Sequence, residues 1–341
     1  MAETSFCISS DTNISNEESE VGMSRKRHCK TMPKCSSMRV MQVGMTLPSV
    51  PPALLQQHCR EDTAPAKPLD FGSGFSLPGH SVRLLEVING HERDTRIQFF
   101  ADGHIYYIDG KRSLGSVTGL VHEFSYEFCA DRVIQKMMSG FWWPRPEYTH
   151  DSGQPFTKDE IKSKWERNRI ESANRGTWMH FTFELWLNRC PVDLDAPEMQ
   201  LFLNFVDSLT GLRAYRTEWE IFGDDEHLAG SIDFVAESVD DRSLTIIDWK
   251  RTKSIASKYV GQNFMKSPLQ HISDCSGMHY RLQLNCYRYL LEKYYDRRVS
   301  TMLVVCTHPD VGSQAYIDNV PVMLVETEAM MSWQRSRAEQ A

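Results

Sequence analysis

The 341-residue sequence lacks any long hydrophobic run. No apolar stretch approaches the roughly 20 residues that a membrane-spanning helix needs, so we expect no membrane protein. The N-terminal region also lacks the apolar core of a secretory signal, and its acidic residues differ from the Arg-rich, acid-poor composition of a mitochondrial presequence. We therefore expect an intracellular protein, and the sequence leaves open whether it acts in the nucleus or the mitochondrion.

Paired cysteines are missing as well. The nine cysteines are scattered along the chain without a single C-x-x-C pair. An odd number of unpaired cysteines is typical of neither a disulfide framework nor a zinc knuckle. We interpret them as reduced thiols of an intracellular protein.

There is no excess of positive charge. The chain has 38 Lys and Arg against 45 Asp and Glu, which gives a formal net charge of −7 with histidine neutral. This balance argues against a chain that coats nucleic acid through bulk charge. It leaves room for a local basic strip.

Aromatic residues are scarce in the first 80 residues. This segment holds 7 of the 15 prolines, none of the 8 tryptophans and only three aromatic residues. It buries too little apolar surface to offset the entropy lost on ordering. We predict a disordered tail over 1–81 and one globular domain over 82–341. For the basic cluster at 25–30 in the tail, a nuclear address and a solvated charge run are the alternatives.

Hydrophobic periodicity in the domain predicts an alternation of helices and strands. Strands are expected at 96–100, 104–108, 215–222, 228–237, 244–250 and 300–306, with a weaker one near 320–325. Helices are expected at 117–138, 158–174, 177–188, 197–210, 278–295 and the C-terminus. Short polar turns join the three central strands, which predicts an antiparallel meander.

Charged residues interrupt the otherwise apolar strand expected at 244–250. Because side chains alternate along a strand, Asp248 and Lys250 project from one face while their apolar neighbours point into the core. Asp233 lies on the neighbouring expected strand, and we expect it to meet Asp248 across the ladder. Two carboxylates beside a lysine are costly in a buried strand unless a cation lies between them. The pattern predicts a site for Mg²⁺ or Mn²⁺, with a solvated charge pair as the alternative.

Two further acid-containing patterns are candidates for the same site. His180 and Glu184 are four residues apart on one face of an aromatic-rich helix, so His180 is either a site ligand or a core histidine bonded to Glu184. Glu218 and Glu220 share a face of the strand expected at 215–222. One of these two glutamates is a candidate ligand, and the other is expected to be solvated.

The segment after the third central strand contains basic residues and no acid. From 250 to 273 it carries Lys250, Arg251, Lys253, Lys258 and Lys266, with Tyr259 and Phe264 interleaved. Such a strip is suited to tracking a phosphate backbone and stacking bases, and a solvated loop is the alternative. On the helix that follows, Gln283 and Tyr287 are four residues apart, with a site role and plain packing both open.

Taken in order, these motifs resemble the RecB-like branch of the PD-(D/E)XK nuclease superfamily. The resemblance covers roughly residues 96 to 307. It rests on a helical Gly-x-x-x-His, a strand Glu, Gly-x-Ile-Asp, Ile-Asp-Trp-Lys and a helical Gln-x-x-x-Tyr. Within the branch, the segments at 116–118 and 247–250 are most similar to mitochondrial genome maintenance exonucleases and related phage and bacterial exonucleases.

The resemblance implies an α/β fold with a restriction-endonuclease-like core, in which helices flank a central mixed β-sheet. It also implies metal-dependent hydrolysis of DNA phosphodiester bonds. Asp233 and Asp248 would hold Mg²⁺, for which Mn²⁺ substitutes, and the backbone carbonyl of Trp249 would complete the shell. Lys250 would orient or activate the attacking water and offset charge in the transition state.

The remaining motif residues have supporting roles in this comparison. His180 would be a further metal ligand or site organiser, and Glu218 a supporting acid. Gln283 and Tyr287 would steady the site and contact the DNA strand, while the basic strip with Arg251 and Lys253 would bind DNA. Some members of the branch carry an iron–sulfur cluster on a C-terminal cysteine triad. Here one cysteine lies in the last 50 residues, so we expect no cluster.

We therefore expect a metal-dependent deoxyribonuclease, acting as an exonuclease on single-stranded DNA or free ends. A structure-specific endonuclease would share every catalytic residue and is the alternative among enzymes. A non-catalytic nucleic-acid-binding module that retains the fold is the alternative from another class. Polarity and the preference for DNA over RNA do not follow from the sequence.

Overall fold

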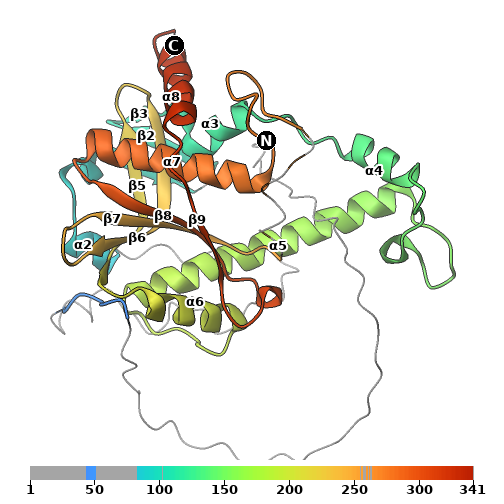
Figure 1. The fold of residues 1–341 in the computed structure, drawn as a ribbon, viewed down its shortest axis with the longest axis horizontal. Coiled ribbons are helices and arrows are strands. Elements are labelled where there is room, and N and C mark those ends of the chain that lie inside the picture. Colours follow the sequence, from blue (N-terminus) through green and yellow to red (C-terminus); the bar gives the residue numbers. More distant parts are fainter. Residues whose placement is uncertain are drawn as a thin grey trace, which may run out of the picture.

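The computed structural model describes residues 44–50, 83–101, 103–253, 255, 259, 261 and 263–340. Within these ranges the chain has a mixed α/β fold, in which helices flank a six-stranded mixed sheet (Figure 1). The predicted combination of a central mixed sheet with flanking helices is confirmed at this level.

The central sheet is built from strands of the middle and C-terminal parts of the chain: β4 (Gly115–Ser116), β5 (Leu212–Gly223), β6 (Leu228–Ser238), β7 (Leu244–Lys250), β8 (Val299–Cys306) and β9 (Tyr316–Asn319). Strand β6 pairs antiparallel with both β5 and β7, which confirms the predicted meander. Strand β8 runs parallel to β7, and the short β4 runs parallel to β6, so the sheet is mixed.

A second, three-stranded sheet consists of β1 (Ile97–Phe100), β2 (Ile105–Ile108) and β3 (Lys111–Arg112). Strands β1 and β2 are antiparallel, so the predicted hairpin is confirmed. Its expected turn includes Asp102, which lies outside the described residues. Strand β3, which pairs antiparallel with β2, was not predicted because two residues carry no periodicity.

The helices that the structure describes are α2 (Leu84–Ile88), α3 (Val117–Glu123), α4 (Ala130–Met138), α5 (Lys158–Leu187), α6 (Pro197–Ser208), α7 (Ser276–Tyr294) and α8 (Leu324–Ala338). Short 3₁₀ helices are η1 (Glu92–Arg96), η2 (Pro146–Tyr148) and η4 (Pro309–Val311). Among the described parts of the chain, no helix combines the length and apolar character needed to cross a bilayer.

The central sheet is buried on both faces, because successive residues of its strands enter different clusters. Ile246 packs in the cluster formed with α3, α7 and α8. Ile247 and Trp249 pack in the cluster formed with α5 and α6. The indole of Trp249 stacks on Phe234 and makes edge contacts with aromatic rings of α5 and α6. The strand that carries Asp248 and Lys250 is therefore held firmly from the α5 side.

Helix α5 corrects the predicted break at Gly176. It runs without interruption from 158 to 187, and a capping box formed by Thr157 and Glu160 starts it. A glycine inside a helix costs only about 1 kcal/mol relative to alanine. Burial of Trp178 and Phe183 just beyond the glycine outweighs that cost.

The single helix predicted over 117–138 is also wrong, since α3 and α4 are separate. Between them the backbone amide of Tyr126 donates to Asp274 Oδ2 at 2.9 Å. Ser125 Oγ lies 3.1 Å from His279 Nε2. These partners from a distant segment replace helical hydrogen bonds, and a sequence pattern does not reveal them.

The strand expected near 320–325 is displaced toward the N-terminus as β9. Pro321 has no N–H to donate to a ladder, which ends the pairing. The amide of Met323 instead donates to Asn285 Oδ1 at 2.8 Å, and α8 starts at the next residue.

Residues 44–50, which fall within the predicted disordered tail, pack on the domain. Met45 is fully buried in the cluster between the sheet and α5. The amide of Thr46 donates to the Leu212 carbonyl, and its carbonyl accepts from Ala214, both at 3.0 Å. The rest of that prediction, including the basic cluster at 25–30, lies outside the described residues.

A helical arm extends from the core. It comprises α4, η2 and the N-terminal half of α5, which project away from the central sheet in Figure 1. The arm has a small apolar cluster of its own, formed by Ile134, Tyr148 and Ile161 with partly buried aromatic neighbours. It can therefore hold its shape at a distance from the sheet.

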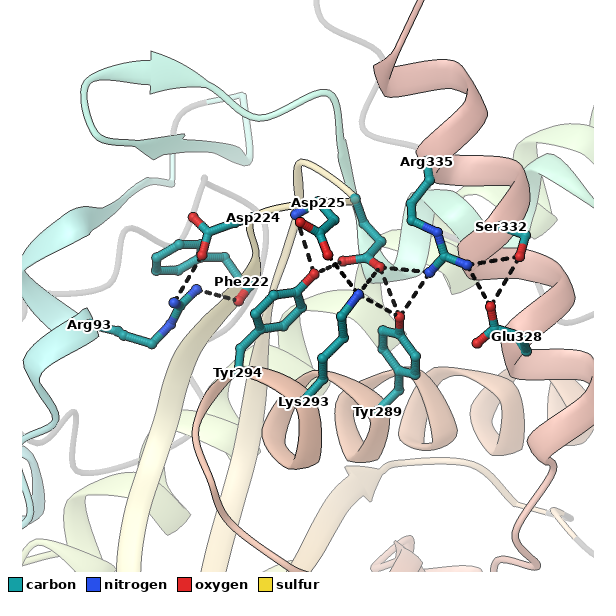
Figure 2. A network of polar contacts seen from close by, with 11 residues as sticks. Arg93, Phe222, Asp224, Asp225, Tyr289, Lys293, Tyr294, Glu328, Ser332 and Arg335 are labelled. Carbon is teal, nitrogen blue, oxygen red and sulfur yellow. Dashed lines mark hydrogen bonds and ion pairs between the residues drawn. The ribbon is translucent and has the colours of Figure 1, made fainter.

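A buried carboxylate fixes α7 and α8 to the turn between β5 and β6. Glu226 is fully buried and accepts from Tyr289 Oη at 2.9 Å, Lys293 Nζ at 3.0 Å and Tyr294 Oη at 2.5 Å, all on α7. Arg335 of α8 donates to it at 3.0 Å. Figure 2 shows these four donors converging on the turn. The network sets the position of the helix that carries Gln283 and Tyr287.

Candidate metal centre

Three predicted site residues from different elements meet at one place. His180 lies on α5, Glu218 on β5 and Asp233 on β6, and their ligand atoms all lie within 4.8 Å of one another. His180 Nδ1 is 3.5 Å from Asp233 Oδ2 and 4.0 Å from Glu218 Oε1. Among the described residues, no other group of three His, Cys, Asp or Glu side chains is arranged to hold a metal ion.

An unusual backbone conformation accompanies Glu218. Its φ of 43° lies in the left-handed region, which costs a residue with a side chain about 1 kcal/mol. Ser231 Oγ donates to Glu218 Oε2 at 3.2 Å. Burial, followed by the charge of Asp233, raises the pKa of Glu218 well above its ordinary value. Glu220, the other candidate of the pair, is not part of the three-residue group.

Asp233 bonds to the strand that carries the other acid. Its Oδ2 accepts a 2.8 Å hydrogen bond from the backbone amide of Trp249. Asp233 was expected to contact Asp248 across the ladder. Its hydrogen bond to β7 is instead to the backbone of Trp249, the residue after Asp248. Burial raises the pKa of Asp233, and Lys250 and the Trp249 amide oppose that rise.

Asp248 and Lys250 lie together on one face of β7, as predicted. Lys250 Nζ is 2.6 Å from Asp248 Oδ2. Burial raises the pKa of Asp248 to about 6, against the lowering influence of Lys250. Burial alone would lower the pKa of Lys250, but Asp248 and Asp233 outweigh it and the net pKa is raised. The lysine therefore keeps its charge at neutral pH.

His180 has the properties of a neutral ligand. Burial, followed by the charge of Lys250, lowers its pKa to about 4, while Asp248 and a hydrogen bond with the Trp249 backbone oppose the shift. The alternative of a core histidine bonded to Glu184 is wrong, because Glu184 pairs with Arg83 instead. At neutral pH the ring therefore offers a lone pair, as metal ligation requires.

Gln283 and Tyr287 form the predicted pair on α7. Gln283 Nε2 donates to Tyr287 Oη at 3.1 Å, and Tyr287 is buried. The pKa of Tyr287 is raised chiefly by burial, with smaller contributions that include Asp233 and Asp248, so its phenol lies near the acids. A Cβ at Gly230 would lie 2.7 Å from Tyr287 Cε1. The glycine of the Gly-x-Ile-Asp motif is what lets this ring approach β6.

The two basic residues predicted to bind DNA have different environments. Arg251 donates to Glu198 at 2.9 Å and its side chain is only 9% exposed, so this guanidinium faces the protein and does not fit the predicted contact. Lys253 is 66% exposed and pairs with Asp310 at 3.0 Å on the surface. Lys258 lies outside the described residues.

Two residues near the site were missed although the sequence carried a signal for each. Ser231, which bonds Glu218, is two residues before Asp233 and so shares its strand face. The ring of Tyr280 has its centroid 4.8 Å from Lys250 Nζ. Its position three residues before Gln283 places it on the same helix face as that residue.

Arg83 was missed without any signal. It pairs with Glu184, and its Nη1 donates to the Glu218 carbonyl at 3.2 Å. It thereby supports the backbone at the left-handed residue. It precedes the first expected strand, and no motif includes it.

The donor set fits a hard divalent cation. Asp248 is buried, while Glu218 and Asp233 are partly buried. Burial raises the pKa of all three carboxyl groups, and Lys250 lowers the pKa of the two aspartates. A cation bound by these side chains would offset the repulsion of Asp233 with Glu218 and with Asp248. Carboxylate oxygens, a neutral imidazole and a backbone carbonyl at Trp249 are ligands that Mg²⁺ or Mn²⁺ accepts.

Comparison with known proteins adds no family to this description. The chain matches no protein-family model, and no curated protein matches it. The functional assignment therefore depends on the site residues themselves.

Proposed function

We propose that the protein is a metal-dependent nuclease that hydrolyses phosphodiester bonds of DNA, on a restriction-endonuclease-like core of the RecB-like PD-(D/E)XK type. The observation that carries the proposal is the ion pair of Asp248 and Lys250 next to the cluster of His180, Glu218 and Asp233. A charged lysine beside converging carboxylates supplies two requirements of phosphodiester hydrolysis, which are a cation site and a fixed positive charge.

The acids would hold the metal. Asp233 and Asp248 on adjacent strands, with His180 from α5 and the carbonyl of Trp249, are the proposed ligands for Mg²⁺, and Mn²⁺ substitutes. A metal bound there would supply charge neutralisation at the scissile phosphate and a lowered pKa of its bound water. Glu218 supports this arrangement from β5, and the Asp233 bond to the Trp249 amide keeps the two strands in place.

Lys250 acts on the reacting groups directly. Its ammonium stays protonated because Asp248 and Asp233 stabilise the charge. From this position it orients the attacking water and stabilises the negative charge that develops on the phosphate oxygens. Gln283 and Tyr287 on α7 form one side of the site and contact the substrate strand.

We further propose that the enzyme is an exonuclease on single strands or free ends. The test is cleavage of end-labelled linear and of circular single-stranded DNA in Mg²⁺, Mn²⁺ or EDTA. Metal-dependent loss of the linear strand alone, abolished by Asp248→Ala and retained by the exposed control Asp310→Ala, supports the proposal. Cutting of circles would assign an endonuclease, and binding without cleavage under any metal would assign a non-catalytic module.

A further inference from the structure

The tip of the helical arm carries two aromatic side chains in solvent. Phe141 is 90% exposed and Trp142 is 80% exposed, which exceeds every other large apolar side chain among the described residues. Their ring centroids are 5.1 Å apart and their planes meet at 87°. Two flat apolar surfaces are thus presented outward in different directions, and exposed apolar surface of this kind marks contact sites.

The exposure is not caused by a lack of structure around the tip. The next residue, Trp143, stacks on Tyr148 with centroids 6.0 Å apart, and Trp165 Nε1 donates to Tyr148 Oη at 2.8 Å. The arm therefore has a packed aromatic core that takes in Trp143. Phe141 and Trp142 are held outside that core on a supported base.

Two exposed basic residues precede the aromatic pair in the sequence. Arg132 and Lys136 are exposed and four residues apart on α4, while Ile134 faces the core of the arm. Neither basic side chain has an ion-pair partner within the described part of the chain. Basic side chains next to exposed aromatic rings are the combination that binds single-stranded nucleic acid, with phosphates on the charges and bases on the rings. A purely apolar partner would gain nothing from the two charges.

Helix α5 connects the arm to the metal site. Helix α5 begins at the arm and carries His180 near its other end, 22 residues after Lys158. At 1.5 Å per residue this separates the start of α5 from the site by about 33 Å. A DNA strand whose end lies in the metal site can contact the tip of the arm only if the DNA strand is long.

We propose that Phe141 and Trp142, with Arg132 and Lys136, form a second binding surface that stacks unpaired bases of the substrate strand away from the metal site. This inference rests on the proposed function, because it takes the nuclease substrate as the occupant. Under this inference, the arm makes the affinity for the substrate depend on the length of the strand.

Binding of fluorescein-labelled oligothymidine in EDTA, followed by anisotropy, tests the surface without cleavage. For a strand of about 30 nucleotides, Phe141→Ala/Trp142→Ala should weaken binding at least about tenfold, and for about 6 nucleotides affinity should be unchanged. Leu324→Ala/Val325→Ala, an exposed apolar pair on α8, is the matched control. Arg132→Gln/Lys136→Gln should weaken long-strand binding and flatten its salt dependence.

Wild-type affinity for the long strand in both arm variants would overturn the proposal. So would a wild-type dimer that the aromatic variant converts to a monomer in light scattering, because the tip would then bind a second copy of the chain. Cleavage by the wild type in Mg²⁺ is measured alongside. If the wild type cleaves and the arm variants bind normally, only this surface fails. If the variants lose binding and the wild type never cleaves, only the nuclease fails.

Discussion

Asp233 on β6 accepts its hydrogen bond from the amide of Trp249 on β7 at the point where the ladder between the two strands stops. The last backbone pair on this side joins Phe234 and Ile247. Backbone pairing between β6 and β7 therefore ends next to Asp233 and Asp248. Beyond this point the Asp233 side chain bonds to β7 in place of the backbone. The side chains at this point are those that would hold the proposed cation.

Metal-free protein should lose stability as the pH rises toward neutrality. Burial raises the pKa of Asp248 from 3.8 to about 6. The folded state thus binds this proton more tightly than the unfolded chain does. The resulting stabilisation is fully present below pH 3.8 and is lost as the pH rises through about 6. A shift of this size corresponds to about 3 kcal/mol.

Urea unfolding in EDTA between pH 4 and 7 measures this effect. Asp248→Asn should show a smaller loss across that range, because Asp233 and Glu218 still titrate while Asp248 does not. Mg²⁺ at pH 7 should stabilise the wild type more than the variant. Identical pH slopes for the wild type and Asp248→Asn would contradict the buried environment assigned to this carboxyl.

Two glycine-to-alanine changes should have opposite effects on stability. At Gly230 the added methyl meets Tyr287 and Val117 at 2.7 and 3.1 Å, so Gly230→Ala should cost about 1–3 kcal/mol and move the tyrosine. At Gly176 a Cβ meets nothing within 4 Å, so Gly176→Ala should add about 0.5–1 kcal/mol of helix stability. Urea denaturation measures both, and equal effects of the two changes would argue against the close approach of Tyr287 to β6.

The Glu226 network should be a major contributor to stability. Burial alone would raise the pKa of Glu226, but Tyr294, Lys293 and Arg335 outweigh it and the net pKa is lowered. Its stabilisation is therefore present above pH 4.5 and is lost as the pH falls below that value. Glu226→Ala removes the buried acceptor shared by four donors, of which Lys293 and Arg335 keep other carboxylate partners, and should cost about 2–3 kcal/mol at pH 7.

The matched control for that change is Glu328, an exposed carboxylate that pairs with the same Arg335 (Figure 2). Glu328→Ala should cost no more than about 1 kcal/mol, because surface ion pairs contribute little. Chemical denaturation of both variants makes the comparison. A Glu226→Ala variant as stable as Glu328→Ala would show that the buried network does not hold α7 and α8 in place.

The sequence was sufficient for the elements with a clear period. Alternation at 244–250 predicted both the strand and the shared face of Asp248 and Lys250, since backbone geometry alone determines that relationship. Spacing of four likewise predicted the contact of Gln283 with Tyr287. These are local relationships within one element.

Relationships between distant segments were not accessible in the same way. A bond between His180 and Glu184 was one of two alternatives, but Arg83, 101 residues before Glu184, pairs with that glutamate instead. Arg251 looked like part of an exposed basic strip until the fold placed Glu198 beside it. In each case a partner brought in by tertiary structure decides the role, and helix continuity through Gly176 was decided by burial rather than by propensity.

The proposed function is tested most directly by the rate at which Lys250→Ala cleaves linear single-stranded DNA in Mg²⁺. The wild type and Lys111→Ala, a change at an exposed lysine on β3, are measured for comparison. Circular dichroism establishes that all three proteins are folded. From the proposed function we expect metal-dependent cleavage by the wild type and the control, and a loss of at least about 100-fold in Lys250→Ala. Equal rates for the wild type and Lys250→Ala, or cleavage that persists in EDTA, would contradict the proposed function.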